Sequence, residues 1–171
     1  MNSRVLVNTG SGKGKSSAAW GIMIRSWARG WNVCVIQFIK GGGWKTGERK
    51  VADHLGIEFH CMGDGFTWES SDIDETARKA REAWDMASVK LAGGDYDVLI
   101  LDEVTYPVKY GWIPVSEVVD AINNRASRTN VVLTGRDAPP ELIEIADTVT
   151  EMVKIKHAHD QGIKARKGIE Y

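Results

Sequence analysis

Short apolar runs alternate along the chain with longer stretches in which apolar positions recur every three or four residues. The short runs are typical of strands and the longer stretches of helices, and this alternation is the pattern of βαβ crossovers in a parallel sheet. Most runs are continuously apolar, as expected of strands covered by helices on both faces. The predicted strands are residues 4–9, 32–38, 57–62, 97–102, 130–134 and about 148–155. We therefore predict an α/β fold with a doubly wound, mostly parallel sheet.

Two long helices are predicted from the spacing of apolar residues. The helix over residues 15–29 should end at Gly30, with an inward stripe formed by Trp20, Ile24 and Trp27. The helix over residues 72–92 should end at Gly93 and Gly94, with five inward residues: Ala77, Ala80, Trp84, Ala87 and Leu91. Shorter helices are expected after Pro114, a proline in the first turn, and after Asp137, a carboxylate cap. Segments 40–46, 63–71 and 156–171 are predicted to be loops.

Composition and charge narrow the class of protein. The chain has 171 residues, 43% of them hydrophobic and 26% charged, which predicts one globular domain spanning residues 1–171. The net charge of −1 supplies no long-range attraction for nucleic acid, so we expect no nucleic-acid partner. Cys34 and Cys61 are too few for a disulfide scaffold or a thiolate metal cage. With no apolar run near ~18 residues and no signal peptide, we expect a cytoplasmic protein without a membrane partner.

A glycine-rich loop lies directly between the first predicted strand and the first predicted helix. In such a P-loop, backbone N–H groups surround phosphate oxygens, a lysine reaches the phosphates and a hydroxyl can ligate Mg²⁺. Lys15 and Ser16 supply the last two groups. Thr9 stands where the general pattern has glycine, and Gly10 can shift the turn by one residue. The predicted phosphate-binding residues are Thr9, Gly10, Ser11, Gly12, Lys13, Gly14, Lys15, Ser16 and Ser17.

An acidic pair ends the fourth predicted strand. Asp102 and Glu103 follow four apolar residues, and strand ends of a parallel sheet meet at one edge, so these acids should lie near the P-loop. An apolar run before Asp-Glu is a weak pattern alone, but beside a P-loop it predicts a magnesium site. Which of the two carboxylates contacts the metal stays open.

Loops at the same sheet edge are expected to complete the cleft. Residues 37–41 and 105–106 follow strands there, and Phe66 with Trp68 places two aromatic side chains in a glycine-bounded loop. The aromatic pair either faces a ligand or anchors the loop on the core. His157 and His159 lie in a basic tail that is either solvated or a basic lid over an anionic ligand. No further Cys or His stands at zinc-ligand spacing.

Together these motifs resemble the P-loop type of corrinoid adenosyltransferase, the ATP:cob(I)alamin or cob(I)yrinic acid a,c-diamide adenosyltransferase family. The resemblance runs almost from end to end, and Thr9 is part of the family's pattern. Ser11 and Ser16 depart from it by replacing asparagine and threonine, and only three residues precede Arg4, where many relatives carry an arm that can cover the site. The matching segments are TGSGKGKSSAA (9–19), QFIKG (37–41), GER (47–49), GFTWE (65–69), LDE (101–103), TGR (134–136), ADTV (146–149) and 156–171.

The resemblance implies a RecA-like P-loop NTPase fold, a homodimer and an electron-donating reductase such as a flavodoxin or flavoprotein. The implied reaction transfers the 5′-deoxyadenosyl group of ATP to cobalt of a Co(I) corrinoid and releases triphosphate, in adenosylcobalamin biosynthesis or salvage. It makes Lys13, Lys15 and Glu103 catalytic and places Phe66 and Trp68 against the corrinoid. Mg²⁺ or Mn²⁺ would be held by Ser16 and Glu103, with Asp102 as the other candidate.

Two further functions are compatible with a P-loop. A RecA-like ATPase or kinase would use Glu103 to orient a water or hydroxyl for attack at the γ-phosphate. A nucleotide-dependent switch would bind ATP without turnover and dock on a partner through Phe66 and Trp68. The phosphorus product distinguishes the three functions: triphosphate, phosphate or none.

Overall fold

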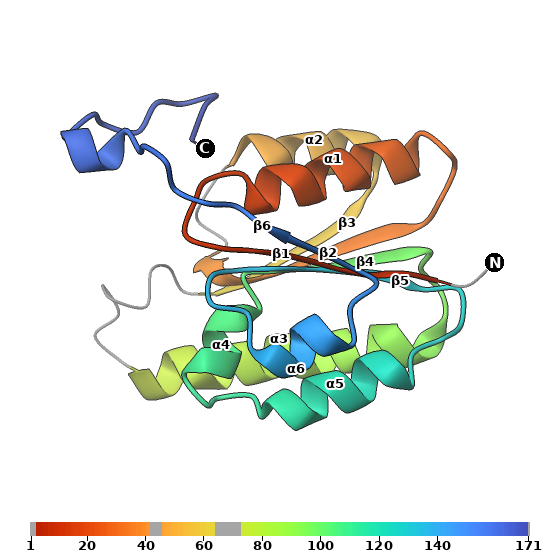
Figure 1. Cartoon of the computed structure of the whole chain (residues 1–171). Helices are drawn as coiled ribbons and strands as arrows, with labels where there is room; N and C mark the ends of the chain where they lie inside the picture. The colour runs from red at the N-terminus through yellow and green to blue at the C-terminus, as the bar shows by residue number, and fades with distance from the viewer. Residues whose placement is uncertain (1–2, 42–45, 64–72, 171) are drawn as a thin grey trace.

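The computed structural model describes residues 3–41, 46–63 and 73–170. Within these residues six strands form one sheet in the order β3-β2-β4-β5-β1-β6, and every pair is parallel (Figure 1). The strands are β1 (Val5–Thr9), β2 (Val33–Gly41), β3 (Glu58–Gly63), β4 (Val98–Asp102), β5 (Asn130–Thr134) and β6 (Thr148–Glu151). The predicted α/β class and doubly wound sheet are confirmed, because helices cover both faces.

Helices α1 and α2 lie on one face of the sheet, and α3, α4, α5 and α6 lie on the other (Figure 1). Their bounds are α1 (Lys15–Trp27), α2 (Gly47–Leu55), α3 (Ile73–Gly93), α4 (Thr105–Lys109), α5 (Val115–Asn123) and α6 (Pro140–Glu144), and a 3₁₀ turn η1 (His159–Gln161) follows β6. In the described part of the chain, no helix combines the length and the apolarity needed to cross a membrane.

Alternate residues of each central strand fill two separate apolar cores. In β4, Leu99 and Leu101 pack in the core that contains Trp84 of α3, whereas Val98 and Ile100 pack in the core that contains Trp20 of α1. All four β4 side chains are at most 1% exposed. Burial on both faces explains why the strand is apolar at every position rather than at every second one.

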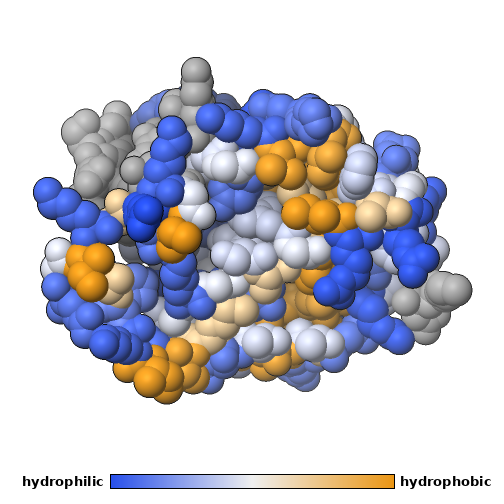
Figure 2. Space-filling model, turned by 90° about the horizontal axis from the view of Figure 1, so that it is seen from above, coloured by the Kyte–Doolittle hydropathy of each residue, from blue (hydrophilic) through white to orange (hydrophobic). Residues whose placement is uncertain are grey.

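The predicted inward stripe of α1 is only partly correct. Trp20 is buried, but Ile24 is 47% and Trp27 42% exposed, because the helix turns Ala19 and Met23 toward the sheet instead. Figure 2 shows this face of the molecule, on which hydrophobic side chains lie in small groups among hydrophilic ones. The Trp27 indole is held at the surface by a 3.0 Å hydrogen bond from Nε1 to the carbonyl oxygen of Leu55.

Four of the five inward residues predicted for α3 are buried, and Ala77 is the exception because the turn buries Thr76 instead. The predicted carboxylate cap at Asp137 is wrong. Asp137 has φ 52°, and its carboxylate accepts from Lys109 at 2.6 Å. The last helix begins at Pro140 after Pro139 as N-cap.

Three further features differ from the sequence prediction. Pro114 is the N-cap of α5 rather than a residue of its first turn. Strand β6 ends at Glu151, forms an edge of the sheet beside β1 and is exposed at all four residues. Helices α2 and α4 were not predicted, since α2 buries only Ala52 and α4 spans five residues.

Candidate nucleotide-binding site

The P-loop is fixed to the end of strand β6. The Gly12 N–H donates to the Met152 carbonyl oxygen at 2.6 Å, and the Met152 N–H donates to the Thr9 carbonyl oxygen at 2.8 Å. A Cβ at Gly12 would lie 2.6 Å from the same Met152 oxygen, so glycine is required by a close backbone approach. Gly10 and Gly14 have φ values of 98° and 120°, which side-chain-bearing residues rarely adopt. The loop is therefore shaped both by its own backbone and by β6.

Lys15, the lysine expected to contact phosphate, is folded onto the loop itself. Its Nζ donates to the Gly12 carbonyl oxygen at 2.6 Å. Burial and the neighbouring charge of Arg136 lower the pKa of Lys15, while Glu103 and Asp102 act in the opposite direction. The ammonium is thus held at the mouth of the P-loop beside a second cation, an arrangement that favours an anionic ligand between them.

The two acidic residues at the end of β4, Asp102 and Glu103, lie in different environments. Asp102 is fully buried, and its carboxylate accepts from Gln37 Nε2 at 2.8 Å and from Thr134 Oγ1 at 2.6 Å. The same Thr134 oxygen accepts from the Glu103 N–H at 2.9 Å. Asp102, at the end of β4, therefore joins the middle of β2 to the end of β5, and Thr134 also fixes the backbone of Glu103.

Glu103 has an unusual backbone conformation. Its φ of 61° lies in the left-handed region, which costs a residue with a side chain of order 1–3 kcal/mol and occurs most often at functional sites. The Glu103 side chain lines the hollow beside the P-loop. The structure thus brings Glu103 and the P-loop together, as the sequence predicted, and places Asp102 behind them.

The hollow has a volume of about 260 Å³ and is built from segments far apart in the sequence. Six of its lining residues were predicted as site residues: Lys13, Gly14, Lys15, Ser16, Ser17 and Glu103. Tyr106 was placed at the same cleft. The others were not assigned a role from the sequence: Glu48, Thr134, Gly135, Arg136, Ile169 and Glu170. The start of the P-loop consists of Thr9, Gly10, Ser11 and Gly12.

Three of these unassigned residues are charged, namely Glu48, Arg136 and Glu170. Arg136 follows β5 at the same sheet edge as the acid pair, and this position after a strand was the feature that could have identified it. Glu48 lies in the first turn of α2, and its Oε2 is buried and accepts no hydrogen bond within the described residues. A buried carboxylate oxygen in this state suits a cation or a hydroxyl donor.

The remaining sequence expectations for the cleft have different outcomes. Phe66 and Trp68 lie outside the described residues. The tail contacts the hollow through Ile169 and Glu170 rather than through basic side chains. Lys154 of the tail pairs with Asp160 at 2.8 Å. The structure thus favours a solvated tail whose last described residues border the site over a basic lid.

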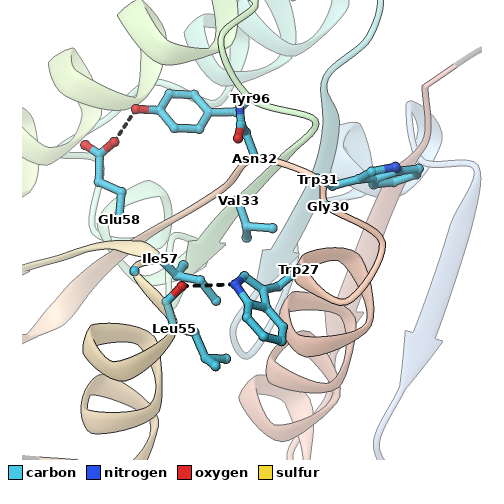
Figure 3. Close-up of a pocket in the computed structure, with 10 residues that line it drawn as sticks. Trp27, Gly30, Trp31, Asn32, Val33, Leu55, Ile57, Glu58 and Tyr96 are labelled. Carbon is cyan, nitrogen blue, oxygen red and sulfur yellow. Dashed lines mark hydrogen bonds between the residues drawn. The ribbon is translucent and has the colours of Figure 1, made fainter.

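A second hollow, of about 370 Å³, lies at the opposite edge of the sheet (Figure 3). It is bordered by Trp27, Trp31, Tyr96 and Glu58, and no lysine or arginine is among its lining residues. This chemistry does not suit phosphate.

Near the second hollow, ligand atoms of Cys34, Glu58 and His60 lie within 4.8 Å of one another. Burial raises the pKa of Cys34 to about 12, so its thiol stays protonated. The Lys90 ammonium already donates to Glu58 Oε1 at 2.7 Å. The Glu58 carboxylate is therefore already paired with a cation.

Comparison with known proteins extends these observations. The family model for ATP:corrinoid adenosyltransferases BtuR/CobO/CobP matches residues 2–171. The corrinoid adenosyltransferase of Escherichia coli (strain K12) is 43% identical over 167 residues, covering 98% of this chain and 85% of the relative. The corrinoid adenosyltransferase of Pseudomonas aeruginosa (strain PAO1) is 44% identical over 171 residues, covering 98% and 83%. Corrinoid adenosyltransferase CobA of Salmonella typhimurium (strain LT2) is 41% identical over 167 residues, covering 98% and 85%.

Among solved structures, HypB from Helicobacter pylori in complex with nickel aligns with 81% of this chain and 81% of its own. The TM-score is 0.26 and the sequence identity 13%, a likeness too weak to bear on fold or function.

Proposed function

The chain belongs to the family of ATP:corrinoid adenosyltransferases, and from this premise we propose that the hollow beside the P-loop holds the triphosphate of ATP during adenosyl transfer. The protein is an enzyme that transfers the adenosyl group of ATP to a corrinoid. One observation carries the placement: Lys13, Lys15 and Arg136 converge on a single hollow whose wall is the P-loop. Three cationic residues around one hollow supply positive charge that can bind a triphosphate.

The proposed chemistry assigns the chain's residues to the leaving group. A Co(I) corrinoid is itself a nucleophile and carries no proton to remove, so the site needs no general base. As the bond from cobalt to C5′ forms, the bond from C5′ to oxygen breaks and its electron pair passes to the triphosphate. The Lys15 ammonium, now on the Gly12 carbonyl, would turn to that growing charge. Lys13, Arg136 and the N–H groups of the P-loop would share it.

The residues of the hollow also fit Mg²⁺ or Mn²⁺. The Ser16 hydroxyl and the carboxylates of Glu103 and Glu48 line one volume, and the buried Oε2 of Glu48 has no hydrogen bond from the described residues. Hard oxygen donors of this kind are the ligands such cations prefer. We propose Ser16 and Glu103 as ligands, with Asp102 as a positioning residue, since Gln37 and Thr134 engage both of its oxygens. The bound cation would neutralise part of the triphosphate charge.

The substitution Glu103→Gln is expected to weaken the apparent affinity for Mg²⁺ on the order of 10–100-fold, because residues that hold or orient a metal have effects of that size. The measurement is the adenosylation rate of chemically reduced corrinoid as a function of Mg²⁺ concentration. Saturating Mg²⁺ should restore part of the rate. Glu144→Gln, at an exposed position of α6, is the control that removes the same charge elsewhere. Intact ATP binding without any rescue by Mg²⁺ would instead support a general base acting at the γ-phosphate.

Three further parts of the function rest on the family resemblance. We propose that Phe66 and Trp68 face the corrinoid, that the protein acts as a homodimer, and that a flavodoxin or flavoprotein supplies the electron for Co(I). The proposed cytoplasmic location is supported by the free thiols of Cys34 and Cys61.

A further inference from the structure

The chain after β6 leaves the P-loop and returns to it. Met152 exchanges backbone hydrogen bonds with Thr9 and Gly12, and at the other end Glu170 Oε1 lies 3.1 Å from Lys13 Nζ. Residues 152–170 therefore form a segment whose two ends both contact the P-loop. Figure 1 shows this segment leaving β6 and folding back toward the α1 side of the sheet.

Glu170 presents its carboxylate to the phosphate-binding region. One oxygen accepts from the Lys13 ammonium, and the other accepts from the Arg166 N–H at 2.7 Å. These two contacts, the backbone one first, lower the pKa of Glu170, so the group is an anion at neutral pH. Ile169 and Glu170 line the same hollow as Lys15, Ser16 and Glu103. The Glu170 carboxylate thus binds Lys13, a residue that we propose to bind the triphosphate.

The segment is lightly attached between its two ends. Every residue from 161 to 170 is exposed, and Ile163 and Ile169 keep 56% and 66% of their surface in contact with solvent. Segments with few buried apolar contacts open at low cost in free energy. Hydrogen bonds within the segment, such as the 3.1 Å bond from the Ile163 N–H to the Ala158 carbonyl oxygen, maintain its local fold, and His157 and Ala158 are half-buried.

We propose that residues 152–170 form a latch on the nucleotide pocket, in which the Glu170 carboxylate occupies Lys13 in place of a phosphate and gives it up when triphosphate binds. The proposal rests on the proposed function, because it needs the hollow to be the triphosphate site. Carboxylate and phosphate compete for the same cation, and tethering gives the weak competitor a high effective concentration near its target. The same contact re-forms when product triphosphate departs, so Lys13 is never left without an anion.

Calorimetric titration of the whole protein with inorganic triphosphate and Mg²⁺ tests the latch. Removing the competitor by Glu170→Gln should lower Kd by about two- to fivefold, the range of a partly exposed ion pair. Glu144→Gln, on the other side of the sheet, should leave Kd unchanged. Thermal unfolding of both variants should lie close to that of the parent, since Glu144 is exposed and a partly exposed ion pair such as Lys13–Glu170 contributes little to stability.

Other results would overturn the latch. An unchanged Kd in Glu170→Gln would show that the carboxylate does not compete with triphosphate. A higher Kd would show that Glu170 positions Lys13 for phosphate instead. If neither the parent nor the Glu170→Gln variant bound triphosphate, both the phosphate-binding role of the hollow and the latch would be wrong. If the two proteins bound triphosphate equally well, only the latch would be wrong.

Discussion

Replacing Lys15 with alanine is expected to lower kcat by on the order of 10²–10³, the cost of deleting one preorganised donor to a developing negative charge. Lys15 is placed for this role by the P-loop, where its Nζ lies 2.6 Å from the Gly12 carbonyl oxygen and beside the charge of Arg136. The loss should appear mainly in the chemical step, because the triphosphate gains charge as C5′ departs. Single-turnover adenosylation of a corrinoid already reduced to Co(I) measures that step.

Lys50→Ala is the matched control for this substitution. Lys50 is an exposed residue of α2 that does not line the hollow, so the variant should keep the parent rate. Normal turnover of Lys15→Ala in Mg²⁺ and ATP would contradict the assignment of this loop to phosphate.

Gly12→Ala is expected to reduce both stability and activity, because the new methyl group would lie 2.6 Å from the backbone oxygen of Met152. Backbone cannot move aside cheaply, and crowding of this kind costs about 1–3 kcal/mol in the free energy of unfolding. The P-loop would also separate from β6, which shapes the phosphate cradle. Thermal unfolding and adenosylation rate, measured on the same preparation, should both fall.

Gly21→Ala separates this steric effect from a general effect of replacing glycine. Gly21 lies within α1, and a Cβ there meets no atom within 4 Å. Alanine should therefore stabilise the helix by about 0.5–1 kcal/mol, and Tm should rise by a few degrees with activity retained. If Gly12→Ala behaved like Gly21→Ala, the close contact between the P-loop and β6 would not matter for the site.

The parts of the site that sequence analysis predicted are those formed by residues adjacent along the chain. The P-loop lies between a strand and a helix that are both evident in the sequence, and Glu103 directly follows a strand of continuously apolar residues. Parallel topology then requires both to meet at one edge of the sheet. Our proposal of Glu103 rather than Asp102 as the metal ligand needed coordinates, because only packing shows that Gln37 and Thr134 engage the Asp102 carboxylate.

The features that the sequence did not reveal depend on contacts between distant segments or on weak local patterns. The Lys13–Glu170 pair joins residues 157 positions apart, and no local pattern links them. Helix α2 spans nine mostly polar residues and buries only Ala52, so the sequence analysis did not predict it and did not place Glu48 in the cleft. The sequence did not determine which of two adjacent faces of α1 packs on the sheet. In the structure Ala19 faces the sheet, whereas Ile24 does not.

The most direct test of the central claim is the phosphorus product formed when the protein is incubated with ATP, Mg²⁺ and a Co(I) corrinoid. If the P-loop holds a leaving triphosphate while C5′ is transferred, ³¹P NMR should show one triphosphate for each adenosylated corrinoid. ADP and orthophosphate should not accumulate with the product. Formation of ADP and orthophosphate in place of triphosphate would contradict the account and place the reaction at the γ-phosphate.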